Sequence, residues 1–407
     1  MSVVASDLRT FVAERLIARN EVSRGLFERE APRLALACKE MAQRFLRGGR
    51  LIAFGHGASA TDAQHVAVEF VHPVIVGKRA LPALDLSASF ESSLPAIGRS
   101  DDIVMGFAPP EGDHLVDVAL SSARARGMQA FALPGKRGDY AIDPPSANVF
   151  ISQELVEVLY HTLWETVHVF FEHSARPAAA ISTSGSVPKG DREDLGAAAF
   201  LYPFLVGNTA DESGIVAGVA QSIRGKAAQD ERLREVSATE QADRIAETVA
   251  EVQQRVRNGA TLLLFGNGGS ATDANDWAID CVSAGPGESI IPALSLSTEP
   301  ATITAIANDV GVDTVFLRQV IAHGRRGDVA IAISTSGGSA NIIAALREAR
   351  KRGMLTVALL GYDGGEIARQ QLADFPIVVP CDDIPRIQEV QASIYHVMTE
   401  AWRQWPA

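Results

Sequence analysis

The sequence predicts an α/β protein of two tandem domains, each with a parallel sheet covered by helices on both faces. The main observation is an internal repeat, in which LIAFGHGASATDA begins at Leu51 and LLLFGNGGSATDA begins at Leu262. The loop glycines Gly55 and Gly266 lie 211 residues apart, which is a domain length and not the short period of a solenoid. In both halves, apolar strand-like runs alternate with helical segments, a pattern typical of a parallel sheet.

The first half is predicted to begin with a long helix over residues 8–47. Apolar residues such as Leu34 and Met41 recur there at helical spacing, and Gly48-Gly49 can end the helix. Three apolar strands are predicted to follow, at residues 51–54, 81–86 and 103–107.

The second half repeats this order. A helix through RIAETVAEVQQRVR is predicted to end at Asn258-Gly259, and residues 340–352 form a later amphipathic helix. The predicted strands of this half are residues 261–265, 293–296, 329–333, 356–360 and 376–379.

The segment between the halves sets the predicted domain boundaries. Residues 176–214 are rich in Ala, Ser, Gly and Pro, which is typical of a linker. Within it, we expect the apolar residues 200–206 to pack back on a domain. The two domains are then predicted to span residues 1–175 and 215–407.

Composition and charge restrict the class of protein. The 407 residues are 47% hydrophobic and 21% charged, as in folded proteins, and the net charge of −12 disfavours direct nucleic-acid binding. No apolar run approaches the ~18 residues of a membrane span, and the N-terminal segment carries Asp and Glu, unlike a signal peptide. The three cysteines lack CxxC spacing, which fits a reducing compartment. We therefore expect a cytoplasmic protein with no membrane contact.

Both glycine loops match the G-x-G-x-x-G/A pattern of dinucleotide-binding folds. Such a site also needs an acidic residue about 20 residues further on, at the end of the second strand. The strand at 293–296 has no acid at its end, and Asp85 lies inside the corresponding first-half strand. The loops alone are therefore a weak signal, and we expect no nucleotide cofactor.

A hydroxyl-rich loop follows the strand at 329–333. The sequence Ser-Thr-Ser-Gly-Gly-Ser, residues 334–339, places four hydroxyl groups directly before the helix at 340–352. Hydroxyl and backbone N–H groups at a helix N-terminus bind phosphate readily. The alternative is an ordinary N-cap, but a cap needs one hydroxyl and not four. The loop therefore predicts a phosphate monoester site.

With these motifs, the second half resembles the SIS (sugar isomerase) domain, and within it the phosphoheptose isomerases, over about residues 244–403. The matching segments are FGNGGSATDA, TAIANDVG, GDVAIAISTSGGSANIIAALREARKRGM, GYDGGEIA and DIPRIQEV. The resemblance implies Rossmann-like three-layer α/β/α SIS domains and aldose–ketose isomerisation of sedoheptulose 7-phosphate. It also implies oligomers with sites at subunit interfaces.

The resemblance assigns roles to particular residues of the second half. It implies that the phosphate is bound by Ser334, Thr335, Ser336 and Ser339. The residues that would contact the rest of the sugar are Asn267, Gly268, Gly269, Ser270, Asn308, Asp309 and Gln388.

Family isomerases bind a divalent metal, usually zinc, through a His and a Glu four residues apart and a Gln and a His eight residues apart. The first half keeps this set as His65, Glu69, Gln153 and His161. The second half is less suited to zinc, because its residues are Asp276, Asp280, Gln388 and His396. The first half, in turn, has Ala-Pro-Pro-Glu-Gly-Asp at residues 108–113, where the serines of the phosphate loop should be.

The first-half set is also chemically coherent by itself. His65 and Glu69 share one helix face, and two imidazoles with a carboxylate are suitable zinc ligands. By the resemblance, Glu69 and His161 are the acid and base groups that move a proton between adjacent sugar carbons. The alternative is that each is an ordinary residue of an amphipathic helix.

Two functions remain open at this stage. In the first, the phosphate groups of the second half and the acid/base groups of the first form a composite site, which isomerises a sugar phosphate such as sedoheptulose 7-phosphate. In the second, the chain is a non-catalytic regulatory or interaction protein that senses a sugar phosphate. In either case we expect a homo-oligomer, as a dimer of two-domain chains. Turnover distinguishes the two, because a sensor binds the sugar phosphate and converts none.

Overall fold

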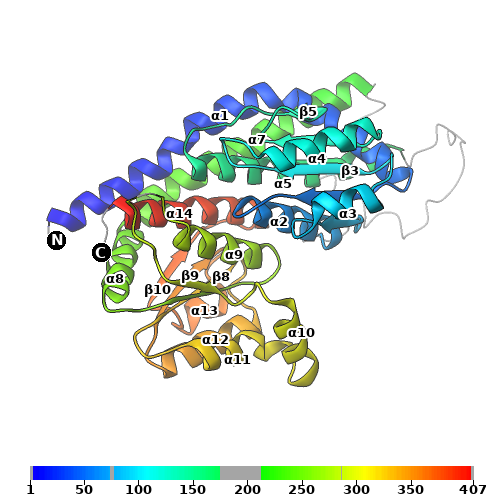
Figure 1. Cartoon of the computed structure of the whole chain (residues 1–407). Coiled ribbons are helices and arrows are strands. Elements are labelled where there is room, and N and C mark those ends of the chain that lie inside the picture. Colours follow the sequence, from blue (N-terminus) through cyan, green and yellow to red (C-terminus); the bar gives the residue numbers. More distant parts are fainter. Residues whose placement is uncertain (1–2, 74–77, 175–211, 286, 405–407) are drawn as a thin grey trace, which may run out of the picture. The chain divides into compact units, whose positions relative to one another are not determined.

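The computed structural model describes residues 3–73, 78–174, 212–285 and 287–404. The chain divides into two compact units, each containing one five-stranded parallel sheet (Figure 1). We call Ser23–Ala228 the N-terminal unit, and Met1–Val22 together with Gln229–Ala407 the C-terminal unit. Residues 175–211, which include the expected packing segment 200–206 and most of the predicted linker 176–214, lie outside the described residues.

The N-terminal unit has the strand order β2-β1-β3-β4-β5, with every neighbouring pair parallel. Its strands are β1 (Leu51–Phe54), β2 (Ala83–Asp85), β3 (Ile103–Phe107), β4 (Gln129–Leu133) and β5 (Tyr140–Ala141). Its helices between and after these strands are α2 (Ser59–Val71), α3 (Phe90–Ile97), α4 (His114–Ala125) and α5 (Val149–Ser174). Residues of α3 and α4 share a buried apolar core with β1, β3 and β4.

The C-terminal unit has the order β10-β9-β8-β6-β7, again all parallel. Its strands are β6 (Leu262–Phe265), β7 (Ala293–Ser295), β8 (Val329–Ser334), β9 (Leu355–Leu360) and β10 (Phe375–Val378). Its helices are α8 (Ala242–Arg257), α9 (Gly269–Val282), α10 (Pro300–Asp309), the short η2 (Val312–Thr314), α11 (Val315–His323), α12 (Ala340–Lys351), α13 (Gly365–Arg369) and α14 (Ile384–Gln404).

Both sheets therefore follow the doubly wound order 2-1-3-4-5 when their strands are counted within each unit. In this topology the chain reverses direction across the sheet between the first and third strands, and ligands bind outside the carboxyl ends of those strands. In the C-terminal unit these strands are β6 and β8, which pair directly. The glycine loop and the serine loop follow these two strands, so the topology places both at one edge.

Strand β6 shows why the sheet is covered on both faces. Leu262 and Leu264 belong to an apolar core that includes residues of α9 and α14, whereas Leu263 and Phe265 belong to a second core that includes residues of α11 and α12. Alternate side chains of a strand point to opposite faces, so two buried faces require a helical layer on each. Figure 1 shows these two pairs of helices on opposite sides of the sheet.

The helix α1 (Val3–Leu46) contributes residues to both compact units, so these units are divided differently from the predicted domains 1–175 and 215–407. Its apolar residues Leu8, Val12 and Leu16 are buried in a core of the C-terminal unit, so the first 22 residues do not fold with the rest of the first half. The second boundary falls at Ala228, inside α7 (Glu212–Glu240). The sequence does not mark these boundaries, because a continuous helix contains no turn residues. The apolar spacing of α1 predicts a helix but does not show which core each of its residues enters.

Replacement of Leu16 by Ala should destabilise the C-terminal unit. Leu16 has no exposed surface, whereas the side chain of its neighbour Ile17 is 49% exposed. Loss of a buried leucine costs about 2–5 kcal/mol in the free energy of unfolding, because burial is lost and a cavity remains. Urea unfolding followed by tryptophan fluorescence measures the effect, and Ile17→Ala is the matched control. Equal unfolding midpoints for the two variants would contradict the assignment of α1 to this core.

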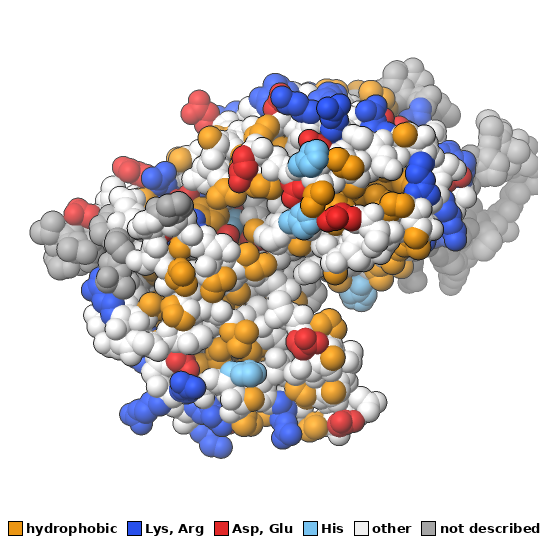
Figure 2. Space-filling view, viewed as in Figure 1, with side chains coloured by type: hydrophobic (Ala, Val, Ile, Leu, Met, Phe, Trp, Pro, Cys, Tyr) orange, Lys and Arg blue, Asp and Glu red, His pale blue; other side chains and the backbone are white. Residues whose placement is uncertain are grey.

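The predicted strands of the second half lie within one residue of the observed ones at each end. Strands β4 and β5 are absent from the predicted strands of the first half, although Ala130–Leu133 is an apolar run. On the face shown in Figure 2, Lys and Arg side chains are spread over several places with Asp and Glu between them. Among the helices that the structure describes, none is both long and apolar enough to cross a bilayer.

Candidate functional site

The serine loop joins β8 to α12 in the C-terminal unit. Ser334 is the buried last residue of β8, and Ser336 is exposed. Ser339 occupies the N-cap position of α12, but its side chain makes no capping hydrogen bond. The hydrogen bond of an ordinary N-cap is therefore absent at this serine, and its role in phosphate binding stays a prediction.

The backbone of the serine loop is held by the segment after β9. Gly337 has a φ of +60°, and a Cβ at this position would lie 2.2 Å from the carbonyl oxygen of Gly364. The backbone N–H of Ile367 donates to the carbonyl oxygen of Gly337 at 3.0 Å. A side chain at residue 337 would therefore displace the loop, since both the dihedral angle and the close contact require glycine.

The glycine loop contacts the start of α12 through a pair of amide side chains. The Nδ2 atom of Asn267 donates to Oδ1 of Asn341 at 3.0 Å, and Nδ2 of Asn341 donates to Oδ1 of Asn267 at 2.8 Å. Asn267 belongs to the loop after β6, and Asn341 lies two residues beyond the serine loop. The two loops that the sequence singled out therefore lie side by side at the carboxyl edge of the sheet.

The other predicted sugar-binding residues lie on several elements. Gly268 has a φ of +56° and precedes α9, which begins with Gly269 and the buried Ser270. Asn308 and Asp309 are exposed at the end of α10, where Nδ2 of Asn308 donates to Oδ1 of Asp309 at 2.8 Å. Gln388 is buried in α14. Their part in sugar binding stays a prediction.

Three of the four predicted metal ligands of the first half meet in the N-terminal unit. His65 and Glu69 come from α2 and His161 from α5, and one ligand atom of each lies within 4.8 Å of the other two. The Nε2 atoms of His65 and His161 are 3.3 Å apart. All three residues are at most 2% exposed, so this cluster is buried.

The donor atoms of this cluster fit a divalent metal. The Oε2 atom of Glu69 is buried and has no hydrogen-bond partner among the residues that the structure describes. Burial, followed by the nearby Glu165 carboxylate, raises the pKa of Glu69 to about 8. A cation would supply the missing partner of the carboxylate, and zinc accepts imidazole nitrogen and carboxylate oxygen together.

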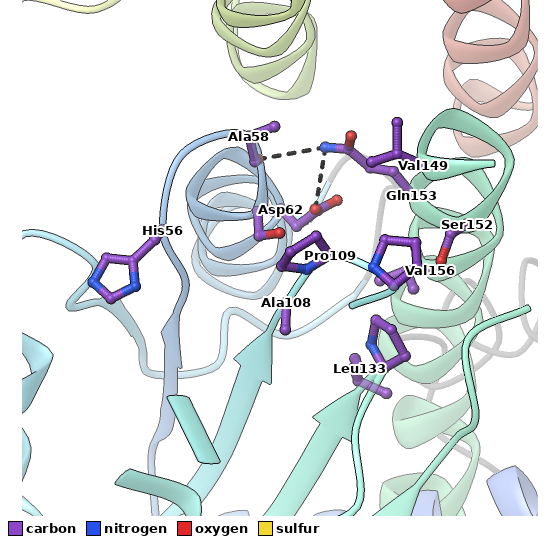
Figure 3. Close-up of a pocket in the computed structure, with 13 residues that line it drawn as sticks. His56, Ala58, Asp62, Ala108, Pro109, Leu133, Val149, Ser152, Gln153 and Val156 are labelled. Carbon is purple, nitrogen blue, oxygen red and sulfur yellow. Dashed lines mark hydrogen bonds between the residues drawn. The ribbon is translucent and has the colours of Figure 1, made fainter. Parts of the chain in front are cut away.

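Gln153, the fourth predicted ligand, lies on α5 and faces the start of α2 (Figure 3). Its Nε2 atom donates to the carbonyl oxygen of Ala58 at 3.4 Å and to Oδ2 of Asp62 at 3.3 Å. These contacts place its amide group in the wall of a pocket. Its role as a metal ligand stays a prediction.

The C-terminal unit contains a second buried cluster at the corresponding positions. The Nε2 atom of His396 lies 3.4 Å from Oδ2 of Asp276 and 3.3 Å from Oδ2 of Asp280. The hydroxyl group of Tyr395 donates to Asp276 at 2.8 Å. Burial, with the charge of Asp276 next, raises the pKa of Asp280 to about 6. These three ligand atoms also suit a divalent cation, with one more carboxylate and one fewer imidazole than the first cluster.

One feature of the first-half loop was not predicted. Asp113 caps α4, accepting from the backbone N–H groups of Leu115 at 2.8 Å and Val116 at 3.1 Å, and it also lies 2.7 Å from Nδ1 of His56. The signal was present in the repeat, because His56 stands at the position of Asn267 and Asp113 follows β3 where a serine follows β8.

Comparison with known proteins gives a family for the second half. The family model described as the SIS domain matches residues 227–361. The phosphoheptose isomerase of Geobacter sp. (strain M21) is 45% identical over 157 residues, which are 38% of this chain and 81% of that protein. The phosphoheptose isomerase of Geotalea daltonii is 40% identical over 181 residues, 44% of this chain and 93% of that protein.

A solved structure resembles the chain over both units. The tagatose-6-phosphate ketose/aldose isomerase of Escherichia coli aligns with 99% of this chain and 94% of its own, with a TM-score of 0.56 and 12% identity. At this identity the likeness concerns the fold alone. Together with the two parallel sheets, it shows that the SIS-type α/β arrangement extends to the first half of the chain.

Proposed function

Because this chain belongs to the SIS domain family, we propose that it binds a sugar phosphate and interconverts its aldose and ketose forms. The observation that carries the proposal is the paired loop structure of the C-terminal unit. The serine loop contains the exposed Ser336 and also Ser339, whose hydroxyl group makes no capping hydrogen bond. The amide pair of Asn267 and Asn341 lies beside this loop. Sedoheptulose 7-phosphate is the first substrate to test, because the two relatives compared above are named phosphoheptose isomerases.

The phosphate group would be bound at the N-terminus of α12. The start of a helix and the positive end of its dipole favour an anion there. The net charge of the chain is −12, so this local field has to overcome a repulsive overall charge. The hydroxyl groups of Ser334, Thr335 and Ser336 would complete the phosphate site.

We assign the chemistry to the cluster of the N-terminal unit. Isomerisation moves a proton between adjacent sugar carbons, with Glu69 as the base and His161 as its acid/base partner. His65 and Gln153 would complete a zinc site with these two residues, and a bound zinc ion would polarise the sugar carbonyl. Phosphate binding is then assigned to one half of the chain and acid/base chemistry to the other. In the alternative assignment, Asp280 and His396 are the acid/base groups that move the proton.

A sensor remains the second candidate, because Asp276 and Asp280 stand where family isomerases have His and Glu. The deciding experiment incubates the full chain, with and without added zinc, with sedoheptulose 7-phosphate and a set of other ketose and aldose phosphates. Formation of the isomer, followed by NMR, is the expected result. Tight binding of a sugar phosphate by calorimetry without any conversion would replace the isomerase proposal with the sensor.

A further inference from the structure

The N-terminal unit has a pocket of its own, with a volume of about 140 Å³, outside the carboxyl ends of β3 and β4 (Figure 3). Much of its wall is apolar, including Ala108, Pro109, Pro110, Val149 and Val156. It lies on the same side of its sheet as the serine loop does in the C-terminal unit, since both follow the strand that pairs with the first strand of the unit.

This pocket has lost the groups that bind phosphate. Pro109 and Pro110 stand two and three residues after β3, where the C-terminal unit has hydroxyl residues after β8. A proline has neither a hydroxyl group nor a backbone N–H, so the loop cannot surround an anion with donors.

The N-terminus of α4 is also capped by a negative side chain of the chain itself. The carboxylate of Asp113 accepts hydrogen bonds from the N–H groups of Leu115 and Val116 at the start of α4. The corresponding residue of the C-terminal unit, Ser339, makes no side-chain capping hydrogen bond. Burial alone would raise the pKa of Asp113, but the hydrogen bond and charge of His56 and the two backbone amides together hold it below its ordinary value. Asp113 is therefore a fixed negative charge beside His56, which lines the pocket.

The wall also carries polar groups that can form hydrogen bonds with the hydroxyl groups of a ligand. Ser152 is 2% exposed, lines the pocket, and its hydroxyl group has no hydrogen-bond partner within the described residues. A buried hydroxyl without a partner is unfavourable unless a ligand or water completes it. Beside it, the amide of Gln153 bonds to the carboxylate of Asp62, and both residues line the pocket.

We propose that this pocket binds a small, neutral, polyhydroxylated molecule, such as a polyol or an unphosphorylated sugar, and that Asp113 excludes phosphate esters from it. The hydroxyl groups of such a ligand would bond to Ser152, Asp62 and Gln153. Its C–H faces would pack against the prolines and valines. A phosphate ester would instead find no donors on Pro109 and Pro110, and it would be repelled by the charge of Asp113 behind His56 of the wall. The chain then has two ligand sites of different charge preference, one in each unit.

The test uses the full chain carrying Ser334→Ala and Ser336→Ala, so that the phosphate loop of the other unit makes no contribution. Ribitol, xylitol and D-ribose are the neutral probes, and ribitol 5-phosphate is the charged partner of ribitol. Saturation-transfer NMR and calorimetry measure binding. We expect at least one neutral probe to bind. If ribitol binds, ribitol 5-phosphate should bind at least tenfold more weakly than ribitol.

Two further substitutions locate the site. Ser152→Ala should weaken binding of the neutral probe about three- to tenfold, as expected for one lost hydrogen bond. The control is Ser92→Ala, at an exposed position of α3, which should leave this affinity unchanged. Asp113→Asn keeps the helix cap and removes the negative charge. It should therefore reduce the difference in affinity between the neutral probe and its phosphate ester.

The proposal is overturned if no neutral probe binds, if the phosphate ester binds as well as the polyol, or if Ser152→Ala has no effect. Failure of the isomerase proposal is a separate result, because it is measured as sugar phosphate turnover by the chain with its serine loop intact.

Discussion

Replacing Glu69 with Gln should lower the turnover of a sugar phosphate by about 10²–10⁴-fold, while its binding stays intact. General acid–base groups contribute rate enhancements of this size. The amide of Gln has nearly the shape of the carboxyl group but cannot take up the sugar proton. Glu69 does not belong to the serine loop, so the affinity for the phosphate should not change. Initial rates of isomer formation and calorimetric titration of the same variant measure the two effects.

The matched variant is Asp280→Asn, which makes the equivalent change in the other buried cluster. We expect it to keep most of the activity if Glu69 is the base. Wild-type activity in Glu69→Gln would refute the assignment of Glu69 as the base. A loss of activity on substitution of Asp280 or His396 instead would also refute it. Metal analysis of both variants adds a second readout, because Glu69→Gln removes a carboxylate ligand of the first cluster and leaves the second intact.

Combined replacement of Ser334 and Ser336 by Ala should weaken sugar phosphate binding by more than a hundredfold. Each hydrogen bond to a charged group is worth about 1.5–3 kcal/mol, and the two losses act on the same phosphate. Calorimetric titration with the sugar phosphate measures the affinity. Ser283→Ala, at an exposed position after α9, is the control and should bind as the wild type does. An unchanged affinity in the double variant would mean that the loop has only a structural role.

Much of the fold could be predicted because strands such as β6 and β9 are apolar runs that end at a glycine. In β6, for example, all four side chains are buried, and Gly266 follows directly. Strand β4 was missed because it is followed by Pro134 and Gly135 and carries Gln129, which is polar but buried with its Nε2 donating to the carbonyl oxygen of Ala37. Such a pairing between distant residues is set by tertiary packing, which the local pattern does not contain.

The candidate site was predicted unevenly. The serine loop could be found because its hydroxyl residues are consecutive and precede a helix. The meeting of His65 with His161, which are 96 residues apart, could be expected only from the resemblance. The pairing of His56 with Asp113 was missed, because each residue alone is an ordinary loop residue. Only the folded backbone brings the end of β1 beside the end of β3.

The placement of Val12 and Leu16 in the C-terminal unit has a consequence for how the chain is made. These residues leave the ribosome well before α14, which packs in the same core, has been synthesised. Folding of that core must therefore wait until α14 has been synthesised, and the apolar residues of α1 lack their native partners during the interval. A cut in the chain between the two halves would separate Leu16 from its core, so neither half would keep the whole of the C-terminal unit.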